Sequence, residues 1–175
     1  ISLLAGSDTA RASDERLFLA GAATSNITPW LGDGLVGNGT PPPAKFIHDE
    51  LYARCFVLDD GATRIALVVI DNIYISREVL DDAKRQVTEA TGLPADRMLM
   101  SCTHTHSSVS ARWGNPFQPG RELTEYQRFV AHRIADEVRC AIHNLQPARI
   151  AWGTADLPGQ VFCRRWLLEP GAELF

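Results

Sequence analysis

Two histidines separated by one residue form the segment of this sequence that is best suited to chemistry. They lie in Ser101-Cys102-Thr103-His104-Thr105-His106-Ser107, where alternate residues of an extended backbone would point the same way about 7 Å apart. Neutral imidazole is a common zinc ligand. His104 and His106 could therefore bind one metal ion together, or one could bind a metal ion while the other acts on a substrate. The alternative is that both are ordinary polar loop residues.

His48 and Asp71 are the residues that could support this pair. His48 precedes an expected strand and could supply a third imidazole or orient a ligand, although a single histidine there is more often a hydrogen-bonded surface residue. Asp71 ends a hydrophobic strand, where its carboxylate could fix the tautomer of a histidine. Its alternative role is to cap the loop that leads into Ser76.

A pair of arginines, Arg164 and Arg165, stands beside Trp166 and could hold an anionic or carbonyl oxygen. A surface ion pair is the simpler interpretation of these two residues. A serine hydrolase is not indicated, because the sequence has no Gly-x-Ser-x-Gly elbow. His132 and His143 lie off the apolar stripe of an expected helix, so we expect both to face solvent.

The strands and helices that must position these residues are predicted from the spacing of apolar residues and from the glycines and prolines that end each element. Residues 1–16 are expected to be a loosely ordered lead-in, and residues 17–175 the folded part. Two segments, 32–43 and 114–120, are rich in glycine and proline and predict loops. Expected strands cover residues 17–23, 51–58 (buried on both sides), 64–70, 97–102, 149–154 and 162–168, and expected helices begin at Ser76 and Thr124 and end near Gly92 and Leu145.

The order of strand 64–70, helix and strand 97–102 predicts a βαβ unit with two parallel strands and the helix on one face. Parallel sheets carry their functional sites at the carboxyl ends of the strands. Asp71 and residues 103–107 fall at that edge. The sequence therefore predicts an α/β fold, with a mostly parallel or mixed β-sheet flanked by helices.

Composition limits the class of protein. The 175 residues, 45% hydrophobic and 22% charged, are enough for one domain with a core. The net charge of -4 argues against nucleic acid as a partner. No apolar run approaches the roughly 20 residues of a membrane-spanning helix. The four cysteines lie far apart and do not indicate a redox compartment, and the sequence starts at Ile1 with no signal-peptide pattern, so we expect any leader to have been removed.

The order of several short segments resembles the amino-terminal catalytic domain of the neutral, non-lysosomal ceramidase family. The resemblance runs over roughly residues 18 to 168. The most specific match is Thr103-His104-Thr105-His106-Ser107, and the apolar strand ending in Asp71 precedes it. The other matching segments are Gly21-Ala22-Ala23, Ile27-Thr28, Ile47-His48-Asp49 and Leu51-Tyr52-Ala53-Arg54.

The resemblance implies a hydrolase that cleaves the amide of N-acylsphingosine with one zinc ion. By the same resemblance His104 is a zinc ligand, His106 contacts the reacting carbonyl or its oxyanion, and Arg164 contacts the substrate. The family's other zinc ligands, a histidine, a glutamate and a tyrosine, lie beyond the position matching Phe175. The resemblance therefore implies that residues 17–175 are the front part of a larger domain, which later strands or a partner chain complete. The residues do not indicate a compartment, and the resemblance alone favours a secreted or periplasmic location.

One departure from the family pattern keeps other functions open. The ceramidases continue from the histidine motif into a Gly-Pro-Gly-Gly loop, whereas Ser108-Val109-Ser110-Ala111-Arg112 follows here. This difference favours a related hydrolase of another amide or ester as the first alternative to ceramide cleavage. A non-catalytic binding domain that has lost the metal is the second.

Overall fold

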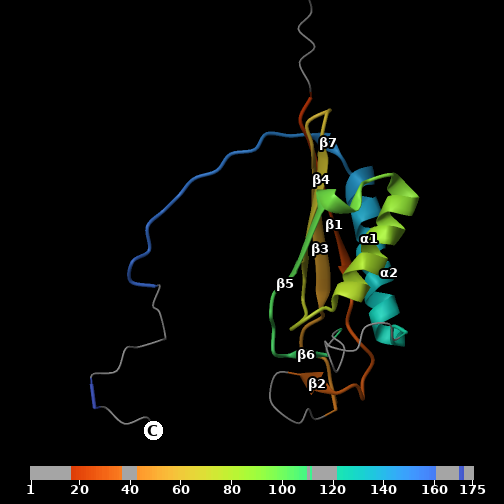
Figure 1. Cartoon of the computed structure of the whole chain (residues 1–175), viewed down its shortest axis with the longest axis vertical. Coiled ribbons are helices and arrows are strands. Elements are labelled where there is room, and N and C mark those ends of the chain that lie inside the picture. The colour runs from red at the N-terminus through yellow and green to blue at the C-terminus, as the bar shows by residue number, and fades with distance from the viewer. Residues whose placement is uncertain (1–16, 37–42, 110, 112–121, 161–169, 172–175) are drawn as a thin grey trace, which may run out of the picture.

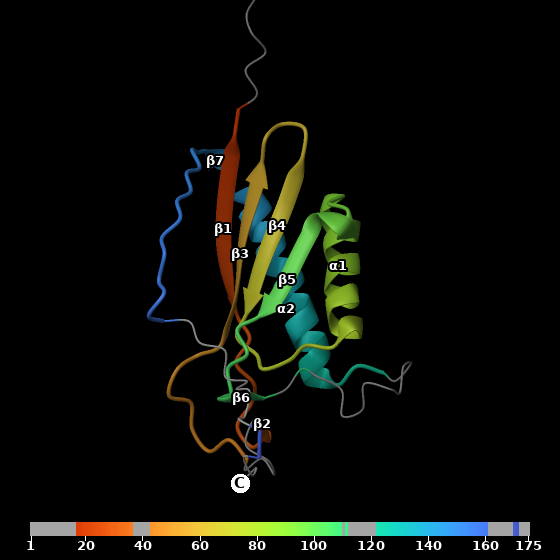
Figure 2. The same ribbon diagram turned by 60° about the vertical axis from the view of Figure 1, so that its left-hand side comes forward.

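The computed structural model describes residues 17–36, 43–109, 111, 122–160 and 170–171. The expected lead-in, the loop at 114–120, the strand at 162–168 and Arg164 lie outside these residues. The described residues form a layer of strands with two helices packed against it (Figures 1 and 2). This arrangement confirms the expected α/β class with a mixed sheet.

Five strands form the main sheet in the order β5-β4-β3-β1-β7. Their bounds are Leu19–Asn26 (β1), Tyr52–Asp59 (β3), Arg64–Ile70 (β4), Met98–Cys102 (β5) and Gln146–Pro147 (β7). β4 and β5 are parallel, whereas β1, β3 and β4 pair antiparallel and β7 pairs antiparallel with β1. Two short strands, β2 (Leu35–Val36) and β6 (Ser108–Val109), pair with each other below the main sheet (Figure 2).

The alternation of side chains along β3 shows which face of the sheet is covered. Ala53, Cys55 and Val57 are buried, whereas Arg54 and Phe56 on the opposite face are exposed. Both helices lie on the same side of the sheet (Figure 1), so the expectation that this strand is buried on both faces is wrong for the described residues. The apolar side chains of the second face lie in the open because no described element covers them.

The helices are α1 (Arg77–Thr91) and α2 (Glu125–His143), with a short 3-10 turn at Ala95–Arg97 before β5. α1 begins after Ser76 and ends at Gly92, which adopts φ 75° and donates its N–H to Thr88. α2 begins with a capping box between Thr124 and Gln127, which satisfies two N-terminal backbone donors. The β4-α1-β5 unit confirms the predicted βαβ motif.

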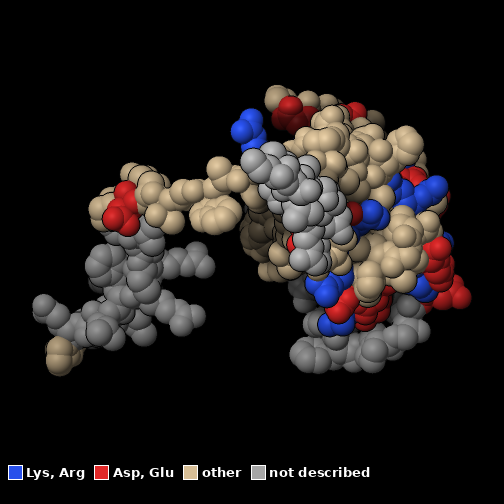
Figure 3. Space-filling view, turned by 90° about the horizontal axis from the view of Figure 1, so that it is seen from above, with Lys and Arg blue, Asp and Glu red and all other residues tan. Residues whose placement is uncertain are grey.

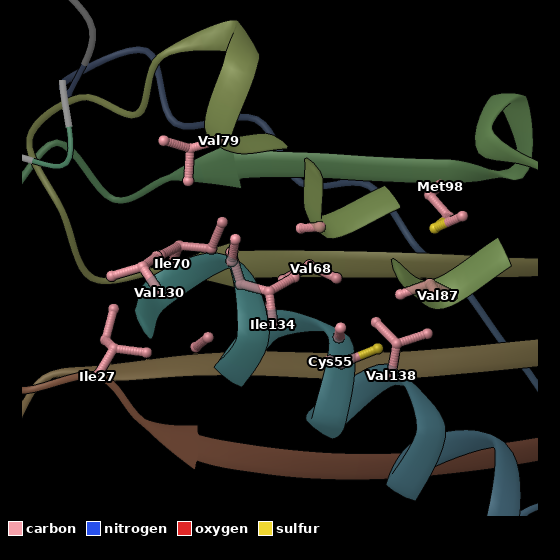
Figure 4. Packing of buried hydrophobic residues seen from close by; sticks show 14 of the residues in the cluster. Ile27, Cys55, Val68, Ile70, Val79, Val87, Met98, Val130, Ile134 and Val138 are labelled. Carbon is pink, nitrogen blue, oxygen red and sulfur yellow. The ribbon is translucent and has the colours of Figure 1, made fainter. Parts of the chain in front are cut away.

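The core lies between the sheet and the two helices. Figure 4 shows Val68 and Ile70 of β4 facing Val130 and Ile134 of α2. Gly21 of β1 lets α2 approach this closely, because a Cβ atom added there would stand 2.1 Å from the backbone oxygen of Ala141. The close contact of α2 with β1 therefore depends on a residue without a side chain.

One charged residue is buried in this core. Glu137 of α2 is 0% exposed, and within the described part of the chain neither of its carboxylate oxygens has a hydrogen-bond partner. Burial raises the pKa of Glu137 to about 8, and the Ser25 backbone, Arg133 and Arg54 oppose this rise. Burial, with the nearby Glu137, also raises the pKa of the Cys55 thiol to about 12.

The expected strand at residues 149–154 is wrong, because these residues have no regular structure and pair with no described strand. After α2, Gln146 and Pro147 pair with β1 as β7, and the Ala148 N–H donates to the Phe18 carbonyl. The first strand also lies later than expected, at Leu19–Asn26 instead of 17–23. Residues 148–160 run away from the body of the molecule (Figure 1).

Acidic and basic side chains are interspersed along the helical side of the molecule (Figure 3). His132 and His143 of α2 are exposed on this side, as expected. Neither of the two helices in the described residues is long and apolar enough to cross a membrane. Cys55, Cys102 and Cys140 carry free thiols.

Candidate functional site

The histidine segment leaves the sheet at the carboxyl end of β5. The Thr103 N–H donates to the Ile70 carbonyl and the His104 N–H donates to the Asn72 carbonyl, each at 3.0 Å. His104 has φ 62°, which is the left-handed region. The expectation of an extended backbone through both histidines is therefore wrong, because the chain turns at His104 to keep these bonds to the end of β4.

The turn nevertheless brings the two imidazoles together. The ring centroids of His104 and His106 are 5.1 Å apart, and the two planes meet at 72°. On its other side the His104 ring meets Tyr74 edge-on, with centroids 5.0 Å apart. The proximity that the sequence predicted is therefore present, although a left-handed turn produces it.

The His104 ring is oriented by the backbone. Its Nδ1 lies 3.0 Å from the Ile73 carbonyl oxygen. Because a carbonyl oxygen can only accept, Nδ1 carries the proton in this contact, and in the neutral ring Nε2 keeps the lone pair. Metal-binding histidines commonly donate their second nitrogen to a carbonyl or carboxylate in this way. Nε2 of His104 is thus suited to bind a metal ion.

Asp71 and His48 lie where they make other contacts. The Asp71 carboxylate accepts hydrogen bonds from the Tyr52 backbone at 3.0 Å and from Arg54 at 2.6 Å. The His48 side chain is 86% exposed and pairs with Asp49 at 2.7 Å. Among the described residues, no hydrogen bond joins either of them to His104. The third supporting residue, Arg164, lies outside the described residues.

The described residues do not complete a metal site. They contain no group of three or more histidine, cysteine, aspartate or glutamate side chains close enough to hold one ion. A catalytic zinc ion normally has three protein ligands. The pair of histidines provides at most two, so zinc binding needs at least one donor from outside the described part of the chain.

A cavity of about 580 Å³ lies on the other side of the histidine segment. Thr105 and Ser107, which alternate with the histidines in sequence, form part of its wall, whereas neither imidazole does. The opposite wall comes from the connection between β1 and β3 and is mainly apolar, with exposed Trp30 and Phe46. His48 stands at this wall. The cavity is therefore suited to an apolar group close to, but not in contact with, the imidazole pair.

Two residues close to His104 were missed in the sequence. Asn72 is fully buried and binds the His104 backbone, and Tyr74 packs on the His104 ring. The spacing of Asn72 in the sequence could have indicated its burial. It lies two residues after Ile70 and four after Val68, on the face of the strand that these two buried core residues occupy. No signal in the sequence marked Tyr74.

No protein-family model matches the sequence. The solved structures that resemble the fold include two ceramidases. Neutral ceramidase from Pseudomonas aeruginosa matches with a TM-score of 0.64 and 21% identity over 77% of this chain and 23% of that chain. A ceramidase complexed with C2 matches with a TM-score of 0.63 and 21% identity, over 75% of this chain and 22% of that chain.

These matches confirm the fold expected from the resemblance to ceramidases. The chain has the fold of part of a neutral ceramidase and spans about a quarter of the length of the two structures.

Proposed function

We propose that the protein is a zinc-dependent hydrolase that cleaves the N-acyl amide of ceramide to a sphingoid base and a fatty acid. The observation that carries this proposal is the pair of contacting imidazoles, with Nδ1 of His104 bound to the Ile73 carbonyl, at the carboxyl end of a strand in a ceramidase-like fold. Structural likeness supports the choice of substrate class, and the imidazole geometry supports the chemistry.

In this proposal His104 is one ligand of the metal through Nε2, because its Nδ1 is already bound to a carbonyl. The remaining ligands come from outside the described residues. When bound, zinc lowers the pKa of a coordinated water and polarises a carbonyl group. The Ile73 carbonyl keeps the His104 ring in one orientation and one tautomer, so the ligand is ready before the metal arrives.

His106 is proposed to act on the substrate. Its ring centroid lies 5.1 Å from that of His104, so in this proposal it acts next to the metal ligand and is not a ligand itself. An N–H of the imidazole would donate a hydrogen bond to the oxygen of the amide as negative charge develops there. Arg164 is proposed to stabilise the same oxygen or to hold the substrate.

The cavity beside Thr105 and Ser107 is consistent with a substrate that has a hydrocarbon chain. Its apolar wall would shield that chain from water, and Thr105 and Ser107 line the same space. The segment that follows the histidines, Ser108-Val109-Ser110-Ala111-Arg112, differs from the ceramidase pattern. This difference favours, as a second candidate, a related hydrolase of another amide or an ester.

The test is metal analysis together with hydrolysis assays on the full-length protein. We expect about one zinc ion per chain and release of fatty acid from ceramide. A parallel panel of N-acyl amides and acyl esters separates the two candidates. A protein that binds no zinc and cleaves no member of the panel would refute both and leave a non-catalytic binding domain.

Two variants assign the histidines. We expect His104→Asn, which tolerates the left-handed backbone, to lose bound zinc and activity together. We expect His106→Ala to keep zinc and to lose about 10² in kcat, as for a lost oxyanion donor. His143→Ala, at an exposed position of α2, is the matched control and should change neither the zinc content nor kcat. Loss of zinc from His106→Ala would make both histidines ligands.

A further inference from the structure

Asn72, two residues after the end of β4, has a polar side chain and is 0% exposed. A buried amide is tolerated when its donors and acceptors are paired. Three of the side-chain bonds of Asn72 go to Tyr74, Val109 and Ala111, in the segments that flank the imidazole pair. The role of this side chain is therefore connected with the histidine site.

The first connection is through the backbone and the side-chain oxygen. The Asn72 carbonyl accepts from the His104 N–H at 3.0 Å, and the Asn72 Oδ1 accepts from the Tyr74 N–H at 3.3 Å. The second bond closes a turn around Ile73. Since the Ile73 carbonyl is the acceptor for Nδ1 of His104, this turn aims the group that selects the His104 tautomer.

The second connection is to the far end of the histidine segment. The Asn72 Nδ2 donates to the Val109 carbonyl at 3.0 Å, and the Asn72 Oδ1 also accepts from the Ala111 N–H at 3.3 Å. Gln127 of α2 donates to the Ala111 carbonyl at 3.2 Å. The chain between His104 and Ala111 is thus held at both ends by one residue.

The amide is also paired on its remaining side. The Tyr126 hydroxyl donates to the Ile27 carbonyl at 3.0 Å. Burial raises the pKa of Tyr126, and a hydrogen bond with the Asn72 side chain opposes that rise. The orientation of the Asn72 amide is therefore fixed from several directions, as a residue that positions others requires.

We propose that Asn72 is a positioning residue for the imidazole pair: its side chain holds the turn at Ile73 and the end of the histidine segment, and so keeps His104 with the proton on Nδ1. The effect on hydrolysis rests on the proposed function. The effect on the His104 tautomer does not depend on that function, because the tautomer can be observed in the metal-free protein.

The experiment compares Asn72→Ala, Asn72→Asp and a control, Asn144→Ala, in the full-length, metal-free protein labelled with 15N-histidine. Asn144 is a suitable control because its amide likewise donates to a backbone carbonyl, that of Ala22, on an edge of the sheet away from the histidines. The 15N shifts of the imidazole report the tautomer, and His104→Asn identifies the His104 signals.

We expect wild type and Asn144→Ala to show His104 in the Nδ1-protonated form. Asn72→Ala, which loses both the acceptor for Tyr74 and the donor to Val109, should show a mixture of tautomers. Asn72→Asp keeps the acceptor for the Tyr74 N–H and should retain the wild-type tautomer. In the zinc-loaded enzyme Asn72→Ala should lower kcat by 10- to 100-fold, the usual effect of losing a residue that orients a ligand, with KM changed less than threefold.

A folded Asn72→Ala that keeps the wild-type His104 spectrum would refute the inference, whatever its stability. If this variant does not fold, amide hydrogen exchange of wild type decides: the His104 N–H should exchange at least 100-fold more slowly than in an unfolded peptide, and exchange at the unfolded rate would refute it. If the wild-type protein has no hydrolase activity, the proposed function is refuted. The imidazole spectra would still test whether Asn72 positions His104.

Discussion

Replacing the buried Glu137 by glutamine should change the pH dependence of stability. In the unfolded chain a glutamate releases its proton near pH 4.5, whereas in the folded protein burial raises the pKa of Glu137 to about 8. Between these values the folded state holds a proton that the unfolded state has lost. The free energy of unfolding of wild type therefore falls as pH rises from 4.5 to about 8, and this contribution is level above that pH.

The magnitude follows from the width of that window. At about 1.4 kcal/mol for each pH unit, wild type loses roughly 5 kcal/mol between pH 4.5 and pH 8 through this one group. That loss is large against a typical total stability of about 5–15 kcal/mol. The Cys55 thiol beside it does not contribute below pH 9, because its own pKa is raised to about 12.

The assay is urea unfolding of wild type and Glu137→Gln at pH 5, 7 and 9. We expect the two proteins to differ by about 1 kcal/mol or less at pH 5, where both side chains are neutral in the folded state and the pH is close to the pKa of the unfolded glutamate. At pH 9 the variant should be more stable by roughly 5 kcal/mol, which moves its urea midpoint up by about 2 M. Glu125→Gln, an exposed replacement on the same helix, is the matched control and should differ from wild type by less than about 1 kcal/mol throughout.

A difference between wild type and Glu137→Gln that stays constant from pH 5 to pH 9 would refute the reasoning. It would mean that the carboxylate finds a hydrogen-bond partner or water in solution and ionises at its ordinary pKa.

Three further predictions concern the frame of the site. Gly21→Ala should lower stability by about 3 kcal/mol, because its methyl group would overlap the backbone of α2. The control, Gly153→Ala, adds the same group into open space and should change stability by less than about 0.5 kcal/mol. Thermal unfolding measures both variants. Thr124→Ala should cost about 1 kcal/mol through loss of the capping box, measured by urea unfolding. Asp71→Asn should lower stability by about 1–2 kcal/mol and leave zinc content unchanged, since its carboxylate accepts from Arg54 and the Tyr52 backbone; zinc loss would restore its predicted role in orienting a ligand.

The elements that bury a regular apolar pattern could be predicted from the sequence. The β-branched run at 64–70 became β4, and the stripe beginning at Val79 became the buried face of α1. Residues 149–154 show the limit of this reasoning. An apolar pattern predicts a strand only where another strand accepts its hydrogen bonds, and the described residues provide none.

The position of the imidazole pair could be predicted, but its backbone could not. Spacing in sequence indicated that His104 and His106 lie together, and their rings are in contact. The left-handed turn at His104 depends on bonds to Ile70 and Asn72, which are more than thirty residues earlier in the chain. Glu137 was also missed, although it lies three residues after Ile134 and four before Ala141, inside the buried stripe of α2.

The connection between β1 and β3 forms one wall of the cavity, whereas the pairing of β1 with β3 stabilises the sheet. Its two ends are joined by the pairing of Asn26 with Tyr52 and by the bond from the Ile27 N–H to the Leu51 carbonyl, while residues between them form the apolar wall. Once such ends are closed, doubling the length of a flexible loop costs only about 0.6 kcal/mol. Changes in the length of this connection can therefore alter the wall of the cavity while the pairing of β1 with β3 stays in place.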